Sequence, residues 1–468
     1  MKLTFTFILA FLSYSFLYSQ TLDPSFGIGG KVILPFKMAN ASLYATALDT
    51  KDNLYVTGEA SDVDFYYIFV TKFNSKGQIV STFGKNGFWI DSIPFSSNKS
   101  YHCKGITTDE LNNVYFISQI FSQDGIERLR KINDIGIIDK KFGNEGFCYL
   151  GYNANTYLAK ANNGYIMGSG GKMASPDCKK IKEVYGYTGD LSFSSDGYLY
   201  VASYDGVSKI DTSKSFGSSA VLSFGNNGRV QLPSYSNFLK LNLNSSIFVT
   251  GNKLDIKDTS YLYKLKPSNG SFFNSFGKNG EKHILFSEGN NYITSLGNIV
   301  DKNIFLSAKL DGTGAGSFAL CKLDTNGNFA TSFGTNGRLL IPMGGTDASA
   351  NALLVNSKNE VFAAGYTTIN GQKQLAIIKL KDQPLSVEDL DLNETEVQVY
   401  PNPSKDVFYI KNAPEDAFVN VYNSLGLKVL SKNLKAQPTV NLAEFSSGNY
   451  LMEIVSETYR RVFKIELQ

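Results

Sequence analysis

SFGKNG, at Ser275–Gly280, is one of six copies of a Phe-Gly-x-x-Gly motif in this chain of 468 residues. Successive copies are separated by 57, 59, 82, 52 and 57 residues. A period of this length indicates a repeat architecture in which each copy belongs to one small structural unit. The motif residues are Phe26, Gly27, Phe83, Gly84, Phe142, Gly143, Phe224, Gly225, Phe276, Gly277, Phe333 and Gly334.

A strand signature accompanies the motif and accounts for the one long interval. Apolar segments of the type Leu-Tyr-Val-Thr-Gly precede the Phe-Gly turns, and the interval of 82 residues contains two such segments. The sequence therefore predicts two compact units in this interval, the first without a Phe-Gly turn. The central residues of the seven segments are Tyr55, Tyr115, Ile166, Tyr200, Phe248, Phe305 and Phe362.

Each unit has the pattern of four short strands separated by turns. Asn74-Ser75-Lys76-Gly77 has the composition of a hairpin turn, and Phe83 is expected to close the first unit. Four antiparallel strands per unit are typical of one blade of a β-propeller. The strands expected in the first unit are Tyr44–Leu48, Leu54–Gly58, Ile68–Phe73 and Gln78–Ser81.

The two ends of the repeat region complement each other. Leu22–Gly27 is the tail of a unit that has no strands before it, whereas Leu375–Lys381 is a third strand with no tail after it. Joined, the two segments make one unit, so the N-terminal segment is expected to close a ring. Closure removes a sheet edge that would otherwise favour aggregation. The sequence predicts an all-β fold with a seven-bladed propeller over residues 20–381.

These LDPSFGxxGxV-type segments resemble the delta-60 repeat of bacterial secreted propeller-like proteins. The resemblance covers about residues 22–381. It is interrupted at Cys148–Asp190, where the Phe-Gly turn is absent, so six blades remain the alternative to seven.

The N-terminus has the parts of a secretory signal peptide. Lys2 precedes an apolar run, Leu3–Tyr18, and polar sequence begins at Gln20. We expect residues 1–19 to be removed by cleavage between Ser19 and Gln20. The run is shorter than the roughly 20 residues of a transmembrane helix, so an uncleaved anchor is the less favoured alternative.

The C-terminal part has a different composition and a different strand pattern. Residues 382–396 are acidic and have no strand pattern, which indicates a linker. Seven short strands follow in residues 397–468, which predicts a small β-sandwich. Seven apolar segments carry this prediction: Val397–Tyr400, Val407–Ile410, Phe418–Tyr422, Leu427–Leu430, Val440–Leu442, Tyr450–Val455 and Arg461–Leu467.

Motifs along this domain resemble the type A sorting domain of the bacterial type IX secretion system. The resemblance implies an interaction with the type IX machinery and export across the outer membrane. It also implies removal of the domain, followed by release or by attachment to surface lipopolysaccharide. The expected location is therefore secreted or attached to the outer-membrane surface. The matching residues are Tyr400, Pro401, Asn402, Pro403, Tyr422, Gly426, Gly448, Tyr450 and Lys464.

The sequence offers little evidence for chemistry. With 45 basic and 42 acidic residues the chain is nearly neutral, which argues against a nucleic-acid partner. His102 and His283 are interpreted as surface residues at strand starts, with a ligand or catalytic role as the alternative. No catalytic, cofactor or metal site is predicted, and no transmembrane segment is expected in the mature chain.

Four cysteines and a recurring lysine are given structural interpretations. One disulfide is possible among Cys103, Cys148 and Cys178, whereas Cys321 is expected to be a buried free thiol. A lysine recurs on the third strand, and its stem is expected to pack between blades while the ammonium reaches water. A positive ring that binds an anion is the alternative. The recurring lysines are Lys72, Lys131, Lys209, Lys264, Lys322 and Lys379.

Binding is sought where the units differ from one another. The candidates are the aromatic loop Asp62–Tyr67, the single tryptophan Trp89 and the insertion Gly168–Tyr187. The leading hypothesis is a non-enzymatic propeller that binds glycan or protein. A carbohydrate-active enzyme is the alternative, which needs two convergent carboxylates about 5 to 10 Å apart. A passive structural component of the cell surface is the third interpretation.

Overall fold

The computed structural model divides the chain into two compact units, Ser19–Asp382 and a unit that includes Gln383–Gln468. Secondary structure in the described residues is β throughout, which confirms the all-β prediction. Most of the expected signal peptide and linker, and Gly426, lie outside the described residues. The structure describes residues 18–35, 40–96, 100–121, 126–152, 157–168, 171–184, 189–204, 206–214, 217–242, 245–253, 259–286, 291–312, 316–384, 397–414, 416–423, 427–435, 438–456 and 460–468.

Within its described residues, the larger unit contains seven antiparallel sheets, and the first three are named here in chain order. Sheet 1 consists of β3 (Ser42–Leu48), β4 (Leu54–Ser61), β5 (Phe65–Phe73) and β6 (Phe88–Pro94). Sheet 2 consists of β7 (Ser100–Thr108), β8 (Val114–Phe121), β9 (Ile126–Ile132) and β10 (Phe147–Tyr152). Sheet 3 consists of β11 (Leu158–Lys160), β12 (Ile166–Gly168), β13 (Lys172–Ala174) and β14 (Ile181–Glu183).

The next three sheets repeat the same meander, in which consecutive strands are hydrogen-bonded neighbours. Sheet 4 consists of β15 (Asp190–Phe193), β16 (Tyr198–Ser203), β17 (Gly206–Asp211) and β18 (Arg229–Gln231). Sheet 5 consists of β19 (Tyr235–Asn242), β20 (Ser246–Lys253), β21 (Thr259–Leu265) and β22 (Glu281–Ile284). Sheet 6 consists of β23 (Asn291–Leu296), β24 (Asn303–Leu310), β25 (Ser317–Asp324) and β26 (Arg338–Pro342).

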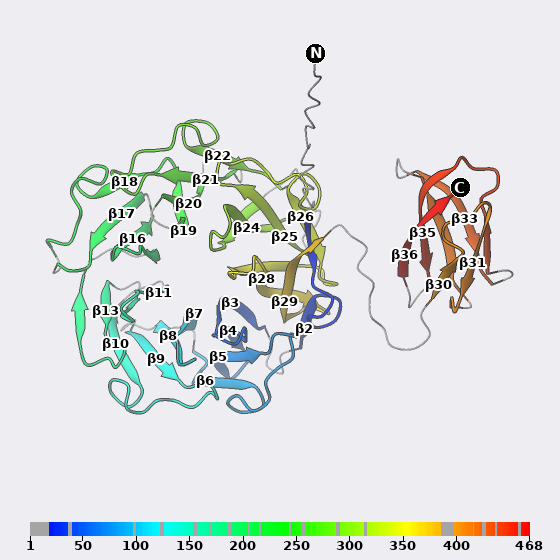
Figure 1. Ribbon diagram of the computed structural model, residues 1–468. Helices are drawn as coiled ribbons and strands as arrows, with labels where there is room; N and C mark the ends of the chain where they lie inside the picture. Colours follow the sequence, from blue (N-terminus) through cyan, green and yellow to red (C-terminus); the bar gives the residue numbers. More distant parts are fainter. Residues whose placement is uncertain are drawn as a thin grey trace, which may run out of the picture. The chain divides into compact units, whose positions relative to one another are not determined.

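Sheet 7 combines strands from both ends of the unit. Its meander is β27 (Ala348–Val355), β28 (Val361–Ile369) and β29 (Gln372–Pro384). The N-terminal strands β1 (Tyr18–Leu22) and β2 (Lys31–Leu34) both pair with β29, and Lys31–Leu34 lies antiparallel to Leu375–Ile378. Figure 1 shows the blue N-terminal strands beside the yellow β29, with the sheets arranged around a common centre.

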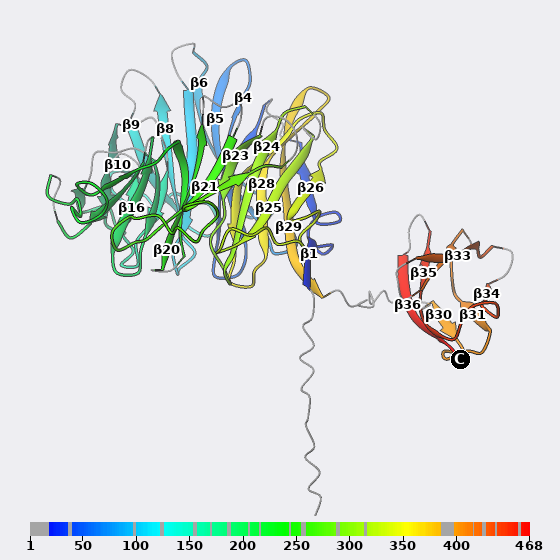
Figure 2. The ribbon, with the colours of Figure 1, turned by 90° about the horizontal axis from the view of Figure 1, so that it is seen from above.

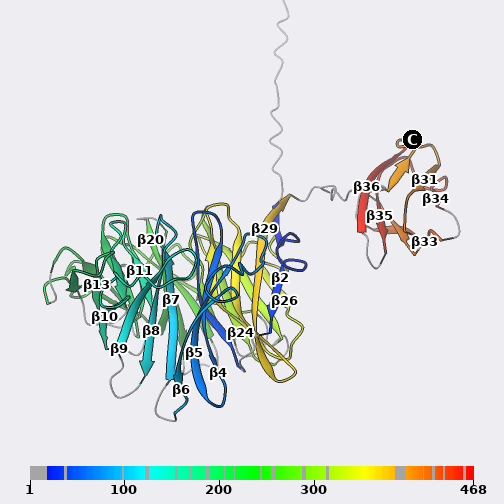
Figure 3. The ribbon, with the colours of Figure 1, turned by 90° about the horizontal axis from the view of Figure 1, so that it is seen from below.

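Side views show the sheets of the larger unit standing next to one another (Figures 2 and 3). The hydrophobic core lies between neighbouring sheets, because each sheet buries side chains on both faces. One cluster joins Tyr55 and Val70 of sheet 1 to Cys103 and Phe116 of sheet 2, and all four residues are fully or nearly fully buried. Burial of apolar side chains therefore stabilises the contacts between sheets as well as the sheets themselves.

The six Phe-Gly turns are buried joints between neighbouring sheets. Each phenylalanine is at most 1% exposed and packs edge-to-face on an aromatic ring of the second strand, as Phe83 does on Tyr55 at 5.7 Å. In four of the turns the following glycine N–H donates to the hairpin turn of the next sheet, as Gly84 does to the Ile135 carbonyl at 2.9 Å. The Phe-Gly turn of one sheet is therefore a contact surface for the hairpin turn of the next sheet.

The predicted position of the fourth strand is wrong. The segment Gln78–Ser81 makes only an isolated bridge from Ile79 to Phe73, and the fourth strand, β6, follows the Phe-Gly turn. The turn geometry explains the difference, because the backbone reverses between Phe83 and Phe88 and re-enters the sheet beside β5. The Phe-Gly turn therefore precedes the last strand of each unit that contains it instead of closing that unit.

Sheet 3 has no Phe-Gly turn of its own, but its hairpin turn accepts the Gly143 N–H of sheet 2 at 3.3 Å, and further contacts join it to its neighbours. Cys178, in its hairpin turn, forms a disulfide with Cys148 of sheet 2, with a Cα–Cα distance of 5.9 Å. On the other side, Lys182 donates to the Thr212 and Ser213 carbonyls of sheet 4, at 2.9 and 2.7 Å. Of the pairings that the sequence left open, the structure contains Cys148–Cys178, while Cys103 is free and Cys321 is a buried free thiol as predicted.

The C-terminal unit contains two sheets around one core. The first is β30 (Gln398–Tyr400), β31 (Val407–Lys411) and β34 (Thr439–Asn441), and the second is β33 (Lys428–Asn433), β32 (Phe418–Tyr422), β35 (Gly448–Val455) and β36 (Arg460–Leu467). Phe408, Val440, Met452 and Ile465 are fully buried in the shared core. The seven strands lie at the positions that the sequence predicts.

Candidate functional site

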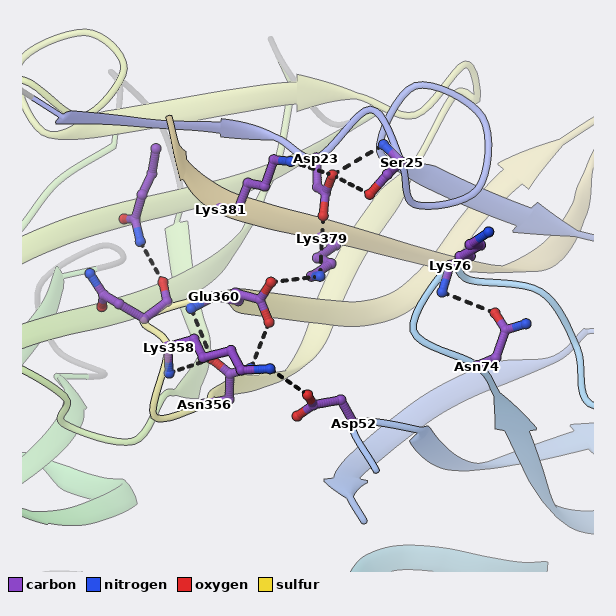
Figure 4. Close-up of polar contacts among 12 residues, drawn as sticks. Asp23, Ser25, Asp52, Asn74, Lys76, Asn356, Lys358, Glu360, Lys379 and Lys381 are labelled. Carbon is purple, nitrogen blue, oxygen red and sulfur yellow. Dashed lines mark hydrogen bonds and ion pairs between the residues drawn. The ribbon is translucent and has the colours of Figure 1, made fainter. Parts of the chain in front are cut away.

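The junction between the N-terminal segment and sheet 7 is a cluster of charges around Asp23 (Figure 4). Asp23 is 2% exposed, and its carboxylate lies 3.1 Å from Lys379 Nζ and 3.2 Å from Lys381 Nζ. Ser25 donates to it through its hydroxyl at 2.7 Å and through its N–H at 3.1 Å. Burial alone would raise the pKa of Asp23, but the hydrogen bonds from Ser25 and Lys379 lower it to about 2.

Further polar contacts connect this junction to sheet 1. Lys358 forms an ion pair with Asp52 at 2.6 Å (Figure 4). Gly27 N–H donates to the Lys76 carbonyl at 2.8 Å. The second contact repeats the Phe-Gly joint seen between the other sheets. The charges at the junction are satisfied by partners within the chain, so we interpret the cluster as structural.

The recurring lysines lie between neighbouring sheets. Three of their ammonium groups donate to turn carbonyls of the next sheet: Lys72 to Asp134 at 3.0 Å, Lys209 to Pro267 at 2.9 Å and Lys264 to Thr325 at 2.7 Å. Each of these three also lies over an aromatic ring of its own sheet. The predicted packing of the stems agrees with the structure, and these three ammonium groups are also held by turn carbonyls of the next sheet.

A cavity of about 550 Å³ lies at the centre of the larger unit. The first strand of every one of the seven sheets contributes to its lining, from β3 through β27. Its polar groups include the side chains of Tyr44, Lys104, Lys240 and Asn351. Because successive side chains of a strand point to opposite faces, the same inner strands supply both core residues and this polar lining.

Charges in the central cavity are already partly paired. Asp190, the one carboxylate among the described lining residues, lies 3.4 Å from Lys240 Nζ and accepts the Leu239 N–H at 2.8 Å. Burial, followed by the charge of Asp190, raises the pKa of Tyr157 to about 12. Lys104 is exposed and lies over the Tyr44 ring at 5.4 Å. This lining lacks the carboxylate pair that a glycoside hydrolase of the common type needs.

A second cavity, of about 260 Å³, is lined by residues of sheets 1, 2 and 7, and Tyr44 lines both cavities. In it, His102 Nε2 lies 2.8 Å from Ser100 Oγ, and His102 Nδ1 lies 3.1 Å from Glu59 Oε1. The same Glu59 oxygen accepts the Cys103 N–H at 3.0 Å. The side chains of His102 and Glu59 are 27% and 17% exposed.

His102 is thus not the simple surface residue that the sequence interpretation expects. Ser100 and His102 are two residues apart on β7, so their side chains share one face of the strand. Glu59 comes from the neighbouring sheet, which the sequence cannot place beside them. The Ser-x-His spacing was the one signal in the sequence that could have indicated the contact.

Of the three binding candidates from the sequence, the structure places one residue of the aromatic loop in a cavity and gives Trp89 and the insertion positions in the sheets. Tyr66 of the aromatic loop lines the second cavity and stacks on Phe95 at 4.7 Å, whereas Val63 is exposed. Trp89 packs against Phe116 at 4.7 Å between sheets 1 and 2, so its role here is in packing. The described part of the insertion Gly168–Tyr187 forms the outer strands of sheet 3 and is not an added loop.

The motif residues of the C-terminal unit support its strands. Asn402 donates to the Lys464 carbonyl at 2.8 Å and accepts the Glu466 N–H at 2.9 Å, which fixes the entry segment on β36. Tyr450 is buried and donates to the Ser446 carbonyl at 2.6 Å. Tyr422 donates to Glu453 at 2.9 Å. Gly448 begins β35, and Tyr400, which precedes Pro401, Asn402 and Pro403, stacks on Tyr409.

The described residues contain no helix long and apolar enough to cross a membrane. In the same residues, no group of three or more His, Cys, Asp or Glu side chains is placed to hold a metal ion.

Residues 398–468 match the family model of the secretion system C-terminal sorting domain. The match confirms the predicted sorting domain, which directs the protein through type IX secretion to the cell surface or the extracellular space. A search of curated proteins finds no match to the chain.

Several solved structures are similar at low identity. The extracellular domain of a protein assigned as a one-component system, from B. thetaiotaomicron, has 12% identity and a TM-score of 0.40, with 93% of this chain and 58% of that chain covered. This chain therefore spans little more than half the length of that protein. A protein of unknown function from Dyadobacter fermentans has 10% identity and a TM-score of 0.40, with 76% and 98% covered.

The β-propeller domain of Nup133 from Vanderwaltozyma polyspora has 10% identity and a TM-score of 0.34, with 74% of this chain and all of that chain covered. These similarities are too distant to transfer a ligand or an activity to this chain.

Proposed function

We propose that the larger unit, residues 20–381, is a seven-bladed β-propeller of delta-60-like repeats that the N-terminal strands close. Seven sheets and the pairing of β1 and β2 with β29 support this proposal. In the same proposal, residues 1–19 are a signal peptide removed between Ser19 and Gln20. Residues 382–396 are a linker, and residues 397–468 form a β-sandwich that is removed during sorting.

The exported propeller binds a glycan in its central cavity. The observation that carries this proposal is the cavity of about 550 Å³, which all seven inner strands line and to which six of them contribute polar residues. This volume lies in the range of small-ligand sites, which is roughly 300 to 1,000 Å³, and is too small for a folded partner. Lys104, Tyr44 and Asn351 offer hydrogen bonds and an aromatic face to sugar hydroxyls and rings.

A carbohydrate-active enzyme at this cavity has less support. Two convergent carboxylates are the usual requirement, and Asp190, the one carboxylate in the described lining, already pairs with Lys240. Protein binding at the ring surface is the other candidate from the sequence, and a protein array can test it beside the glycans.

A glycan array probed with the chain from Gln20 onward tests the proposal. We expect a defined set of glycans to bind, and Lys104→Ala to weaken binding to them about tenfold, as expected for loss of one charge-assisted hydrogen bond. Lys85→Ala is the matched control, because Lys85 is an exposed lysine in the Phe-Gly turn of sheet 1. Binding that is unaffected by Lys104→Ala would contradict a central-cavity site.

A further inference from the structure

We propose that Ser100, His102 and Glu59 form a nucleophilic site for hydrolysis of short-chain carboxylic esters. The site lies in the second cavity, and its chemistry goes beyond ligand binding in the central cavity. Its distances are those of a serine nucleophile with a histidine base: 2.8 Å between Ser100 Oγ and His102 Nε2, and 3.1 Å between His102 Nδ1 and Glu59 Oε1.

The partners of His102 determine which of its nitrogens can act as a base. A carboxylate only accepts hydrogen bonds, so Nδ1 carries the proton and donates it to Glu59. Nε2 is then left with a lone pair that accepts the Ser100 hydroxyl. The Cys103 N–H holds the same Glu59 oxygen at 3.0 Å, which fixes the carboxylate that orients the imidazole. Glu59 is therefore a positioning residue.

Glu59 also breaks the symmetry of the repeat. It directly follows the segment Leu-Tyr-Val-Thr-Gly on β4, the second strand of sheet 1. The corresponding position in the five other units where it is described is not acidic, and it holds Gln119, Tyr204, Asn252, Lys309 and Tyr366. A feature that only one unit carries is expected of a site, whereas a purely structural contact would recur from unit to unit.

The volume of the cavity suits a small acyl group. It measures about 260 Å³ and is lined by Tyr66 and Tyr101 beside the proposed nucleophile. Lys373 and Asn40 line the same cavity and carry N–H groups of the kind that stabilise the oxyanion formed during acyl transfer. These features fit acetyl or similarly short O-acyl esters.

The reaction proceeds in two balanced steps. Ser100 Oγ bonds to the carbonyl carbon while its proton passes to His102 Nε2. The carbonyl π electrons move to oxygen, then return as the bond to the leaving oxygen breaks, and this oxygen takes the proton from His102. A water molecule then attacks the acyl-serine in the same way, with His102 as base. The net reaction converts an ester and water into a carboxylic acid and an alcohol, and Ser100 is regenerated.

The full-length chain can be tested with a fluorophosphonate probe and with p-nitrophenyl acetate. We expect mass spectrometry to find the phosphonyl adduct on Ser100. Ser100→Ala is expected to abolish the adduct and reduce ester hydrolysis to the rate without protein. His102→Gln is expected to slow hydrolysis about 100-fold or more, because it removes the general base.

Matched controls separate catalysis from folding. Ser75→Ala removes an exposed hydroxyl outside the cavity, and His283→Gln removes the other histidine, which also lies outside it, so neither should change hydrolysis. Glu59→Gln is expected to lower kcat about tenfold or more with little change in KM, which a structural role alone would not produce. Ser100→Ala keeps the test valid if a Glu59 or His102 variant fails to fold.

The proposal is overturned if the folded chain gives no adduct on Ser100, or if wild type and Ser100→Ala hydrolyse the ester equally. It is also overturned if Ser100 labels equally fast in the His102→Gln variant. Failure here leaves the glycan proposal intact, because that site is tested through Lys104 and a binding readout.

Discussion

At the scale of single residues, Asp23 shows how a buried charge can stabilise the junction of the two chain ends. It is almost fully buried, yet two lysines and a serine satisfy its carboxylate. A group with a lowered pKa in the folded state favours the folded protein when it is ionised. The stabilisation is present above the ordinary aspartate pKa and is lost as the pH falls towards the lowered value.

Replacing Asp23 by Asn tests this linkage. The shift of the pKa from 3.8 to about 2 corresponds to about 2 kcal/mol of stability at neutral pH. We expect Asp23→Asn to lower the free energy of unfolding by about this amount at pH 7 and by much less near pH 2. Chemical denaturation at several pH values measures the difference.

Asp64→Asn, at an exposed position, is the control for Asp23→Asn. A destabilisation that stays constant between pH 7 and pH 2 would show that the charge of Asp23 is not responsible.

At the scale of elements, the Phe-Gly turn and the hairpin turn of the next sheet form one joint. Gly136 has a φ of +80°, and a Cβ atom there would lie 2.6 Å from the Gly84 backbone nitrogen of the preceding sheet. Gly371 has a similar φ of +77°, but a Cβ atom there would meet no atom within 4 Å. The two glycines share a backbone conformation and differ in their contacts between sheets.

Alanine substitutions at these two glycines separate the stability cost of backbone strain from the cost of disturbed packing between sheets. We expect Gly371→Ala to cost about 1 kcal/mol, because an alanine at positive φ is strained. Gly136→Ala is expected to cost a further 1 to 3 kcal/mol or so, because the added methyl group pushes sheets 1 and 2 apart. Urea denaturation measures the loss in free energy of unfolding for each variant. Equal losses would contradict a close contact between Gly136 and the Phe-Gly turn of sheet 1.

At the scale of the whole molecule, sheet 7 needs strands from both ends of the larger unit. β2 pairs with β29, and Phe26 packs edge-to-face on Phe362 of β28 at 6.0 Å. Without the N-terminal strands, the edge of β29 would present unpaired backbone groups, which favours association with other chains. The C-terminal unit has its own core.

Two truncations test this division. Removal of residues 20–34 is expected to abolish the cooperative thermal transition of the larger unit and to produce oligomers in size-exclusion chromatography. Removal of residues 385–468 is expected to leave that transition within a few degrees of the intact chain, since separate domains unfold independently. An unchanged melting temperature after the N-terminal deletion would contradict closure by β1 and β2.

The sequence by itself determined the all-β class, the spacing of the Phe-Gly turns and the sorting domain, because local patterns carry these features. Alternating apolar residues, turn glycines and short motifs depend on neighbours within about ten residues. For the same reason the seven strands of the C-terminal unit lie where their sequence predicts, and Cys321 is a buried thiol.

Only the tertiary structure decided which sheets contact each other and which side chains these contacts bring together. The Phe-Gly turn leads into the fourth strand because it docks on the next sheet, a contact between residues such as Gly84 and Ile135 that the local sequence does not specify. Glu59 meets His102 across a boundary between sheets, 43 residues apart in the chain. Convergence of this kind depends on the packing of whole sheets, so a single sequence could not indicate either cavity.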